Sequence, residues 1–268
     1  MSLLSTMNNK NTELFNKLWK LDWGVGIFYK SVKKLSNYVL IEGYIPHEYF
    51  NFILPSSSNV SAAELTNIES EFSKLNLKPA LYLTEQYQQL GFTEMLVRNG
   101  YKFKSSEIWL GAEIASLHLN NISTSEIEVA EVSIDNFNDF SSVANTNWSN
   151  EPTQLPYSKI CEETLSGEKF HTGVTSRFFV IYENSKPVSS AGMFYSQKDD
   201  FAYLHCGSTL PEYRGKGYQN KLIQHRLKIA SELGISVAYS IVEEGSVSWS
   251  NFIKLGFNQI QKLVLLTK

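Results

Sequence analysis

The sequence is poor in cysteine, with only Cys161 and Cys206 in 268 residues. Two cysteines form no disulfide framework and no thiolate cluster with metal-ligand spacing, so we expect a reducing, cytoplasmic setting and no metal site. A formal net charge of -3 leaves no basic excess for nucleic acid or for an anionic membrane surface. No uninterrupted apolar run approaches the length that spans a bilayer, and no basic region followed by an apolar stretch opens the chain. Nucleic acid and membrane partners are therefore not expected.

The composition supports a large buried core. Hydrophobic residues make up 43% of the chain and aromatic residues 13%, enough for one large domain or two ordinary ones. The pattern of strands and helices is clearer in the C-terminal half than in the N-terminal half. We expect an N-terminal α/β domain at residues 1–122 and a second domain at residues 123–268.

The C-terminal half predicts an alternation of strands and helices. Short runs rich in β-branched and aromatic residues indicate strands, and apolar residues at helical spacing indicate helices. Ser133 is a candidate N-cap, and Gly234 stands where a left-handed C-cap fits. The expected order is β-α-α-β-β-β-α-β-α-β. Strands are expected at residues 127–132, 177–182, 188–195, 201–210, 235–242 and 261–266, and helices from residue 134, at 157–165, at 220–233 and through 249–255.

The N-terminal half predicts fewer elements, with helices at residues 13–19 and 61–75 and strands at 38–45, 49–54 and 80–83. Residues 95–110 parallel residues 252–266, because both segments indicate a helix, a Gly-aromatic turn and a strand. This parallel predicts a weak internal duplication. The alternative is that a glycine and an aromatic residue after a helix are only a common C-cap. The first half has no counterpart of the glycine-rich loop described next, so as a duplicate it would be a degenerate partner.

A glycine-rich loop, Arg214-Gly215-Lys216-Gly217-Tyr218-Gln219, lies between a predicted strand and a predicted helix. At such a junction free backbone N–H groups and the positive end of the helix dipole form an anion pocket, and glycines let a phosphate approach the main chain. Arg214 and Lys216 can add charged contacts. The loop lacks the Gly-Lys-Ser/Thr ending of a P-loop and the complete dinucleotide fingerprint. A surface turn with a basic flank is the alternative.

The loop and its surroundings resemble the acetyl-CoA-binding signature of the GNAT superfamily of N-acetyltransferases. The resemblance rests on Tyr203 to Gln219, where Arg214 and Gly217 match signature positions and Gln219 replaces a small residue. It also rests on Ser248 to Phe257, which is similar to the family's C-terminal motif. It implies an α/β (α+β) fold with a mixed, mostly antiparallel sheet flanked by helices, and acetyl-CoA as co-substrate.

The resemblance also implies which residues hold acetyl-CoA. Gly207, Ser208 and Thr209 would bind the pantetheine arm with backbone groups, as an added strand would. For Gly207 a simple β-bulge is the alternative, and both can hold. The residues implied for the pyrophosphate are Arg214, Gly215, Lys216, Gly217, Tyr218, Gln219 and Asn220.

The catalytic groups of the family cannot be carried over. The positions where relatives have a glutamate base, a tyrosine acid and an asparagine fall on Ser240, Phe252 and Gly245. The candidate catalytic residues are instead His205, whose imidazole titrates near neutrality, Glu243 and Tyr239. The alternatives are that His205 is a packed strand residue, that Glu243 lies with Glu244 in a surface turn, and that Tyr239 is a core aromatic. Cys206 is possible as an acyl-carrying nucleophile, but a small buried hydrophobe is the better expectation.

The predicted function is an acetyl-CoA-dependent N-acetyltransferase acting on a primary amine of a small molecule or peptide. A CoA-binding module without turnover is the main alternative, and transfer to a hydroxyl or of a longer acyl chain is a further one. The acceptor pocket is expected between residues 145 and 173. The sequence does not predict the oligomeric state. Candidate lining residues are Trp148, Glu151, Tyr157, Glu162 and Glu163. For Glu162 and Glu163, solvated charges on a helix are the better expectation.

Overall fold

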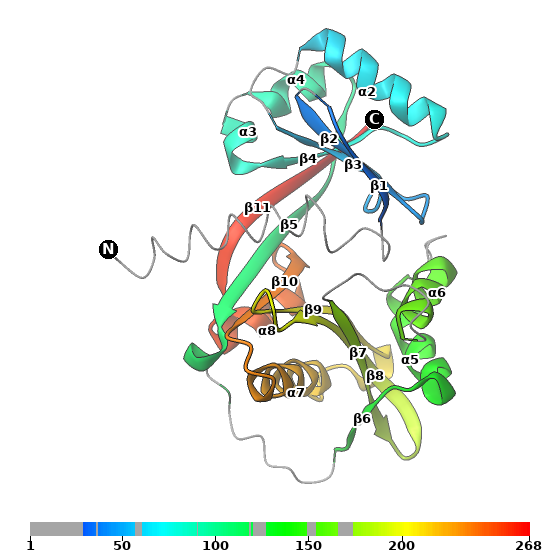
Figure 1. The fold of residues 1–268 in the computed structure, drawn as a ribbon, viewed down its shortest axis with the longest axis vertical. Coiled ribbons are helices and arrows are strands. Elements are labelled where there is room, and N and C mark those ends of the chain that lie inside the picture. The colour runs from blue at the N-terminus through cyan, green and yellow to red at the C-terminus, as the bar shows by residue number, and fades with distance from the viewer. Residues whose placement is uncertain are drawn as a thin grey trace. The chain divides into compact units, whose positions relative to one another are not determined.

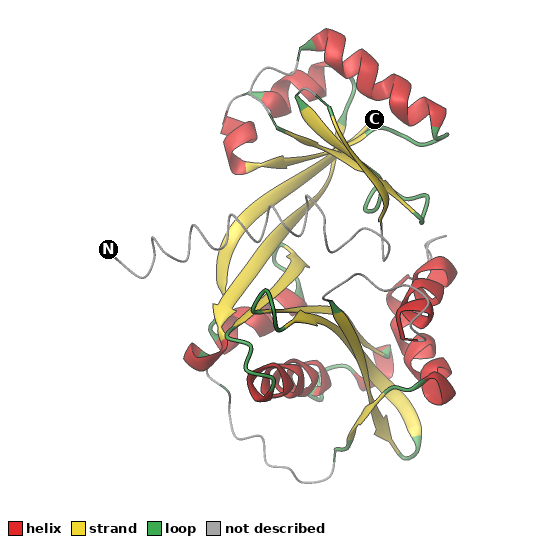
Figure 2. Cartoon of the chain, in the orientation of Figure 1, coloured by secondary structure: helices red, strands yellow, loops and turns green. Residues whose placement is uncertain are grey.

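The computed structural model describes residues 29–35, 37–56, 61–89, 91–117, 119, 127–148, 154–165 and 174–268. The described strands form one mixed, mostly antiparallel sheet, and helices pack against it (Figures 1 and 2). The helix expected at residues 13–19 lies outside the described residues. Within the described ranges, no helix has both the length and the apolar character needed to cross a membrane.

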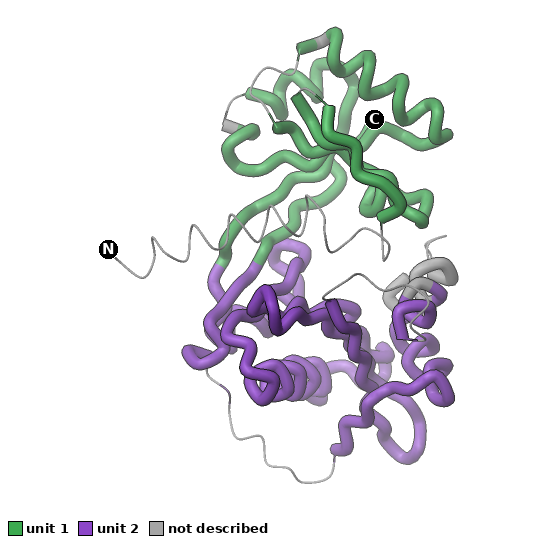
Figure 3. The backbone as a smooth tube through the Cα atoms, viewed as in Figure 1, with its two compact units in different colours: residues 1–109, 259–268 green, residues 110–258 purple. Residues whose placement is uncertain are grey.

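The chain divides into two compact units (Figure 3). Unit 1 comprises residues 1–109 and 259–268, and unit 2 comprises residues 110–258. These ranges differ from the division expected at residues 122 and 123. The strand β5 (Lys102–Glu113) continues from unit 1 into unit 2, and the last strand, β11 (Asn258–Thr267), is part of unit 1. The C-terminal strand therefore belongs to unit 1, although unit 2 directly precedes it in the sequence.

In unit 1 helices cover a sheet whose strand order is β1-β2-β3-β4-β11-β5. The sequence fixes the start of its longest helix, because Ser61 accepts a hydrogen bond from the Glu64 amide while the Glu64 side chain accepts one from the Ser61 amide. The strand expected at 49–54 begins only at Phe52, after a turn. Besides β5 and β11, the elements are β1 (Tyr29–Lys34), β2 (Tyr38–Gly43), β3 (Phe52–Pro55), α2 (Ala62–Lys74), β4 (Ala80–Thr84), α3 (Glu85–Gln89) and α4 (Phe92–Arg98).

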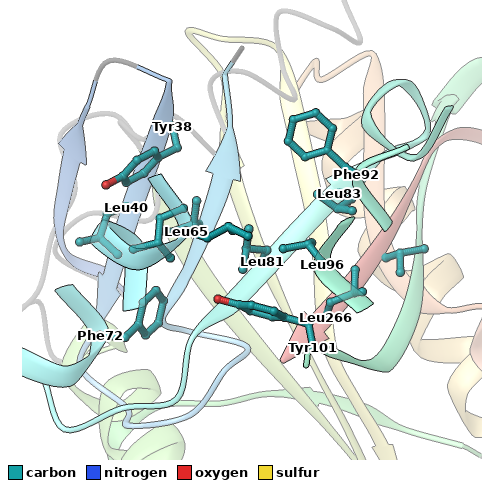
Figure 4. Packing of buried hydrophobic residues seen from close by; sticks show 13 residues of the cluster. Tyr38, Leu40, Leu65, Phe72, Leu81, Leu83, Phe92, Leu96, Tyr101 and Leu266 are labelled. Atoms are coloured by element: carbon teal, nitrogen blue, oxygen red, sulfur yellow. The ribbon is translucent and has the colours of Figure 1, made fainter. Parts of the chain in front are cut away.

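The core of unit 1 shows why β11 belongs there. β11 pairs antiparallel with β4, with Leu263 opposite Thr84 and Thr267 opposite Ala80. The side chain of Leu266 is 1% exposed and lies in the same hydrophobic cluster as Phe72 of α2 (Figure 4). Without this strand, apolar surface on the other elements of unit 1 would be exposed, because β11 covers it.

From β6 to β11 the chain has the predicted order of elements, but the last strand lies in unit 1. The sheet order from β5 onward is β5-β10-β9-β8-β7-β6. The strands at residues 175–183 and 186–196 form a hairpin with a tight turn, in which Asn184 and Ser185 have φ of 50° and 61° and Glu183 pairs with Lys186. The elements are η1 (Ile114–Ser116), β6 (Val129–Glu131), η2 (Ile134–Asn136), α5 (Phe137–Ala144), η3 (Asn145–Trp148), α6 (Gln154–Leu165), β7 (Thr175–Glu183), β8 (Lys186–Ser196), β9 (Phe201–Thr209), η4 (Pro211–Tyr213), α7 (Tyr218–Glu232), β10 (Val237–Glu243) and α8 (Val247–Leu255).

The helices α5 and α7 cover opposite faces of the unit 2 sheet. The Phe178 ring of β7 packs on Phe140 of α5, with centroids 4.9 Å apart. The next ring along the strand, Phe179, packs on His225 of α7 at 5.1 Å. Successive side chains of a strand point to opposite faces, so each neighbour identifies the face that its helix covers.

Part of the order of elements recurs along the chain, and the internal duplication stays a prediction. A parallel crossover β3-α2-β4 in unit 1 corresponds to β9-α7-β10 in unit 2, and α4-β5 corresponds to α8-β11. The last strands are exchanged, since β11 pairs with β4 while β5 neighbours β10. This exchange places β11 in unit 1.

Candidate functional site

The strand β9 has a β-bulge where the pantetheine-binding residues are expected. Ser208 lies opposite Ser190 and His205 opposite Gly192, so two residues of β9 face one residue of β8. Within the bulge Cys206 has φ of 54°, in the left-handed region that non-glycine residues seldom adopt. A bulge redirects the side chains around it, and here it turns Cys206 toward the face that His205 already occupies.

The strands β9 and β10 diverge next to the bulge. Their parallel pairing covers only Ala202 with Ala238 and Tyr203 with Tyr239, although both strands are described over their full length. One residue further, Ser240 donates its hydroxyl hydrogen to the Leu204 oxygen at 2.9 Å. The two strands therefore separate from this point, where His205 to Thr209 follow along β9.

The glycine-rich loop leads directly into α7. Gly215 and Gly217 have φ of 80° and 81°, which a side chain would strain. Gly217 is the N-cap of α7 and makes no side-chain cap, so it provides no acceptor for the first amides of the helix. A Cβ added at either glycine would meet nothing within 4 Å. The helix starts at Tyr218, two residues earlier than expected, and thus reaches the loop itself.

The charge of the loop is partly compensated by Glu183, which sequence reasoning did not find. Lys216 Nζ lies 2.8 Å from Glu183 Oε1, and the Tyr218 hydroxyl also donates to this carboxylate. The hydrogen bond with Lys216 holds the pKa of Glu183 below its usual value. Lys216 Nζ also lies 4.9 Å from the centroid of the Tyr213 ring. No local sequence signal links Glu183 to the loop, because the two meet only through the hairpin.

Gln219 joins the loop to the bulged strand. Its side-chain nitrogen donates to the Ser208 oxygen, to Thr209 Oγ1 at 3.2 Å and to Ser189 Oγ at 3.0 Å. A Cβ added at Gly207 would lie 2.6 Å from Gln219 Oε1, so a side chain there would require the Gln219 amide to shift. The residue that departs from the family signature therefore has a structural role of its own.

The other predicted cofactor-binding residues lie around these contacts. Arg214 Nε donates to the Thr209 oxygen at 3.2 Å, which ties the loop to the end of β9. The Ser208 hydroxyl is directed to α5, where it donates to the Val143 oxygen at 2.9 Å. The Asn220 side chain accepts a hydrogen bond from Gln224 within α7. Strand and loop residues that are separate in the sequence thus form one continuous region.

The three candidate catalytic residues occupy different environments. His205 is partly buried, and its ring stacks on Phe194 with centroids 3.9 Å apart. Tyr239 is 3% exposed, and burial, followed by Asp200, raises its pKa, so it is poorly suited to donate a proton. Glu243 is exposed at the end of β10. Their roles remain predictions.

The expectation for Cys206 was wrong in one respect. Cys206 is partly exposed, and its Sγ lies 2.7 Å from His205 Nδ1. The αL conformation of the bulge brings these neighbouring side chains together, whereas in a regular strand they would point to opposite faces. The sequence indicated a bulge only as one explanation for Gly207 and did not predict the αL conformation of Cys206, so this contact was not foreseen.

The expected acceptor pocket is only partly described. Glu162 is exposed on α6 and Glu163 is half-buried on the same helix. Glu151, and the side chains of Trp148 and Tyr157, lie outside the described residues. Their assignment to the acceptor pocket stays a prediction.

Comparison with known proteins agrees with this geometry. Residues 142–257 match the model of the Acetyltransferase (GNAT) family, a range that includes the bulge, the glycine-rich loop and α8. These residues are therefore similar to a GNAT acetyltransferase domain. A search of curated proteins found no significant match.

Solved structures share the fold at low sequence identity. A GCN5-related N-acetyltransferase from Kribbella flavida is 16% identical over 89% of this chain and 90% of its own, with a TM-score of 0.63. A functionally unknown conserved protein from Staphylococcus epidermidis ATCC 12228 is 14% identical over 90% and 94%, with a TM-score of 0.66. A tandem GNAT protein from the clavulanic acid biosynthesis pathway, solved without AcCoA, is 8% identical over 87% and 78%, with a TM-score of 0.61. These likenesses extend through both units and concern the fold alone.

Proposed function

We propose that unit 2 binds acetyl-CoA along β9 and the glycine-rich loop and transfers the acetyl group to a primary amine of a small molecule or peptide. The single observation that carries this proposal is the start of α7. Gly217 caps this 15-residue helix without a side chain, and the space beside Gly215 and Gly217 is open. The first amides of the helix and its positive dipole end therefore suit a diphosphate.

The pantetheine arm would lie along the strand that diverges from β10. Beyond Tyr203 and Tyr239 the two strands no longer pair, and an extended ligand can hydrogen-bond such an edge as an added strand does. The bulge at Cys206 changes the direction of β9 at this point. The thioester would then lie close to residues 205–207, the segment that also carries the candidate catalytic histidine.

Amine acylation requires a neutral amine, stabilisation of the oxyanion and protonation of the departing thiolate. Ser240 stands at the position of the family's glutamate, and its hydroxyl is engaged with the main chain of Leu204. Phe252, at the position of the tyrosine, is 3% exposed and packs on Phe257. Neither residue can act as the usual base or acid. Alignment of amine and thioester by binding would supply part of the acceleration.

Two measurements on the full chain test the proposal. Isothermal titration calorimetry should detect binding of both CoA and acetyl-CoA, and thiol release should exceed background with at least one primary amine from a broad panel. Binding without thiol release for any amine would favour a CoA-binding module instead. Absence of binding would contradict the proposal altogether.

A further inference from the structure

A cluster of four side chains surrounds the bulge of β9: His205, Cys206, Cys161 and Arg226. The residues come from three elements, β9, α6 and α7, and the cluster contains both cysteines of the sequence. The proposed function uses none of their side chains except His205. His205 and Cys161 contact the sulfur atom of Cys206, and Arg226 donates to the main chain of the same strand.

The first contact is between Cys206 and His205. Cys206 Sγ lies 2.7 Å from His205 Nδ1, a distance at which the imidazole can accept the thiol proton. The histidine is held in place, because its ring stacks on Phe194 at 3.9 Å and meets the Phe178 ring edge-on at 6.0 Å. A Cβ added at Gly192 would lie 2.7 Å from His205 Cε1, so the ring occupies a fitted position.

The second member of the cluster is Arg226, a fully buried arginine that bonds the main chain of His205 beside Cys206. Its side chain is 2% exposed and donates to the main-chain oxygens of Leu222, Gly192 and His205 at 3.0, 2.6 and 3.1 Å. No carboxylate among the described residues contacts its guanidinium. Burial lowers the pKa of Arg226 to about 9, and the charge of Cys206 opposes that shift. A buried cation without a carboxylate is costly, and an anion at Cys206 would offset that cost.

The third contact is with Cys161. This residue is 1% exposed and lies in the hydrophobic cluster against which Cys206 packs. Burial raises the pKa of the Cys161 thiol, and its hydrogen bond with Cys206 raises it further. Cys161 therefore stays protonated and acts as an S–H donor toward the neighbouring sulfur.

We propose that Cys206 is a nucleophile that carries the acyl group between acetyl-CoA and the amine, with His205 as its base and Arg226 and Cys161 as positioning residues. This inference rests on the proposed function. It differs from direct transfer between the two substrates, because the enzyme itself is transiently acylated. Cys206 is partly exposed and adjoins Gly207, where the pantetheine arm is proposed to lie.

The two transfer steps balance. His205 takes the proton of Cys206, and the thiolate attacks the carbonyl carbon of the thioester. The bond between that carbon and the CoA sulfur breaks, and the CoA thiolate takes the proton from His205. The amine then attacks the carbonyl carbon of acyl-Cys206, His205 takes a proton from the amine nitrogen, and Cys206 leaves as the thiolate. The amide forms with no oxidant or other co-reactant.

The experiment is mass spectrometry of the full chain after incubation with acetyl-CoA, without an amine and with acid quenching. We expect a mass increase of one acetyl group, located on the peptide that contains Cys206. Cys206→Ala should lose the adduct while still binding CoA in calorimetry. Cys161→Ser removes the other thiol and alters one positioning residue, so its adduct should still lie on Cys206 but form more slowly than in the wild type.

Two outcomes overturn the inference in distinguishable ways. Binding of acetyl-CoA with no acetyl group on Cys206, together with full activity of Cys206→Ala, overturns the inference and leaves the proposed function intact. Failure of the wild-type chain to bind acetyl-CoA overturns the proposed function, and the inference with it.

A separate readout tests the positioning role of Arg226. Iodoacetamide should alkylate Cys206 more slowly in Arg226→Met than in the wild type, because the thiolate loses a nearby cation. The rate should fall about tenfold for each unit by which the substitution raises the pKa of Cys206. Arg226→Lys retains the charge and should restore part of the rate. Equal rates in all three chains, each shown to be folded by CoA binding, would contradict the role of the buried cation.

Discussion

The carboxylate of Glu183 accepts a hydrogen bond from Lys216 across 2.8 Å, so the turn of a β-hairpin holds the lysine of the glycine-rich loop. Both side chains are substantially exposed, at 30% and 46%. An anion arriving at the start of α7 must therefore compete with a carboxylate that is already in place. The affinity of the loop for phosphate is set by the hairpin as well as by the loop itself.

Glu183→Gln should raise the affinity for CoA several-fold. The substitution removes the negative charge that repels a diphosphate and releases Lys216 to contact it. Calorimetry at low ionic strength would measure the change, and added salt should reduce the difference because exposed charges are screened. Glu131→Gln is the control for charge. Glu131 pairs with Arg177 at the far end of β7, so its substitution should leave CoA affinity unchanged. A lower affinity for Glu183→Gln would mean that Glu183 positions Lys216 for binding.

Gly217→Ala should weaken CoA binding strongly. The added methyl group would occupy the space that the diphosphate needs, and φ of 81° would cost about 1–2 kcal/mol of stability. Gly234→Ala is a matched control, since Gly234 follows the other end of α7 with φ of 76° and equally open surroundings. Both variants should lose similar thermal stability, and only Gly217→Ala should lose affinity in calorimetry. Equal affinities would show that the anion is bound elsewhere.

Gly207→Ala should destabilise the protein by about 1–3 kcal/mol, as overpacking typically does. The new Cβ would lie 2.6 Å from Gln219 Oε1 and would displace the amide from Ser208 and Thr209. The double variant with Gln219→Ala should be less destabilised than the sum of the two single variants, because the clash is then absent. Chemical denaturation of all four chains measures this coupling. Strict additivity would contradict the predicted clash.

Leu266→Ala should destabilise unit 1 by about 2–5 kcal/mol, the usual range for emptying a buried leucine site. Leu266 is 1% exposed and packs in the cluster of unit 1 (Figure 4). Hydrogen exchange should show the loss of protection in α2 and β4. Leu227→Ala, at a fully buried position of α7, should instead affect unit 2. Loss of protection by Leu266→Ala confined to α7 and β9 would favour the division first expected from the sequence.

The sequence alone determined the features that depend on neighbouring residues. Positive φ at Gly215 and Gly217, the capping box of Ser61 and Glu64 and the order of strands and helices in unit 2 all follow from local steric and hydrogen-bonding preferences. The same local pattern sufficed to predict the anion-binding loop and its resemblance to the GNAT signature. Even the bulge was anticipated as one explanation for Gly207, because glycine within a strand often marks one.

Only the tertiary structure decided which distant segments meet. The pairing of β11 with β4, the contact of Glu183 with Lys216 and the approach of Cys161 and Arg226 to Cys206 join residues far apart in the chain. A strand or a charged side chain can satisfy its hydrogen bonds with many partners, and its own sequence does not select among them. The packing of the whole core makes that selection, because each alternative pairing would leave a different apolar surface exposed.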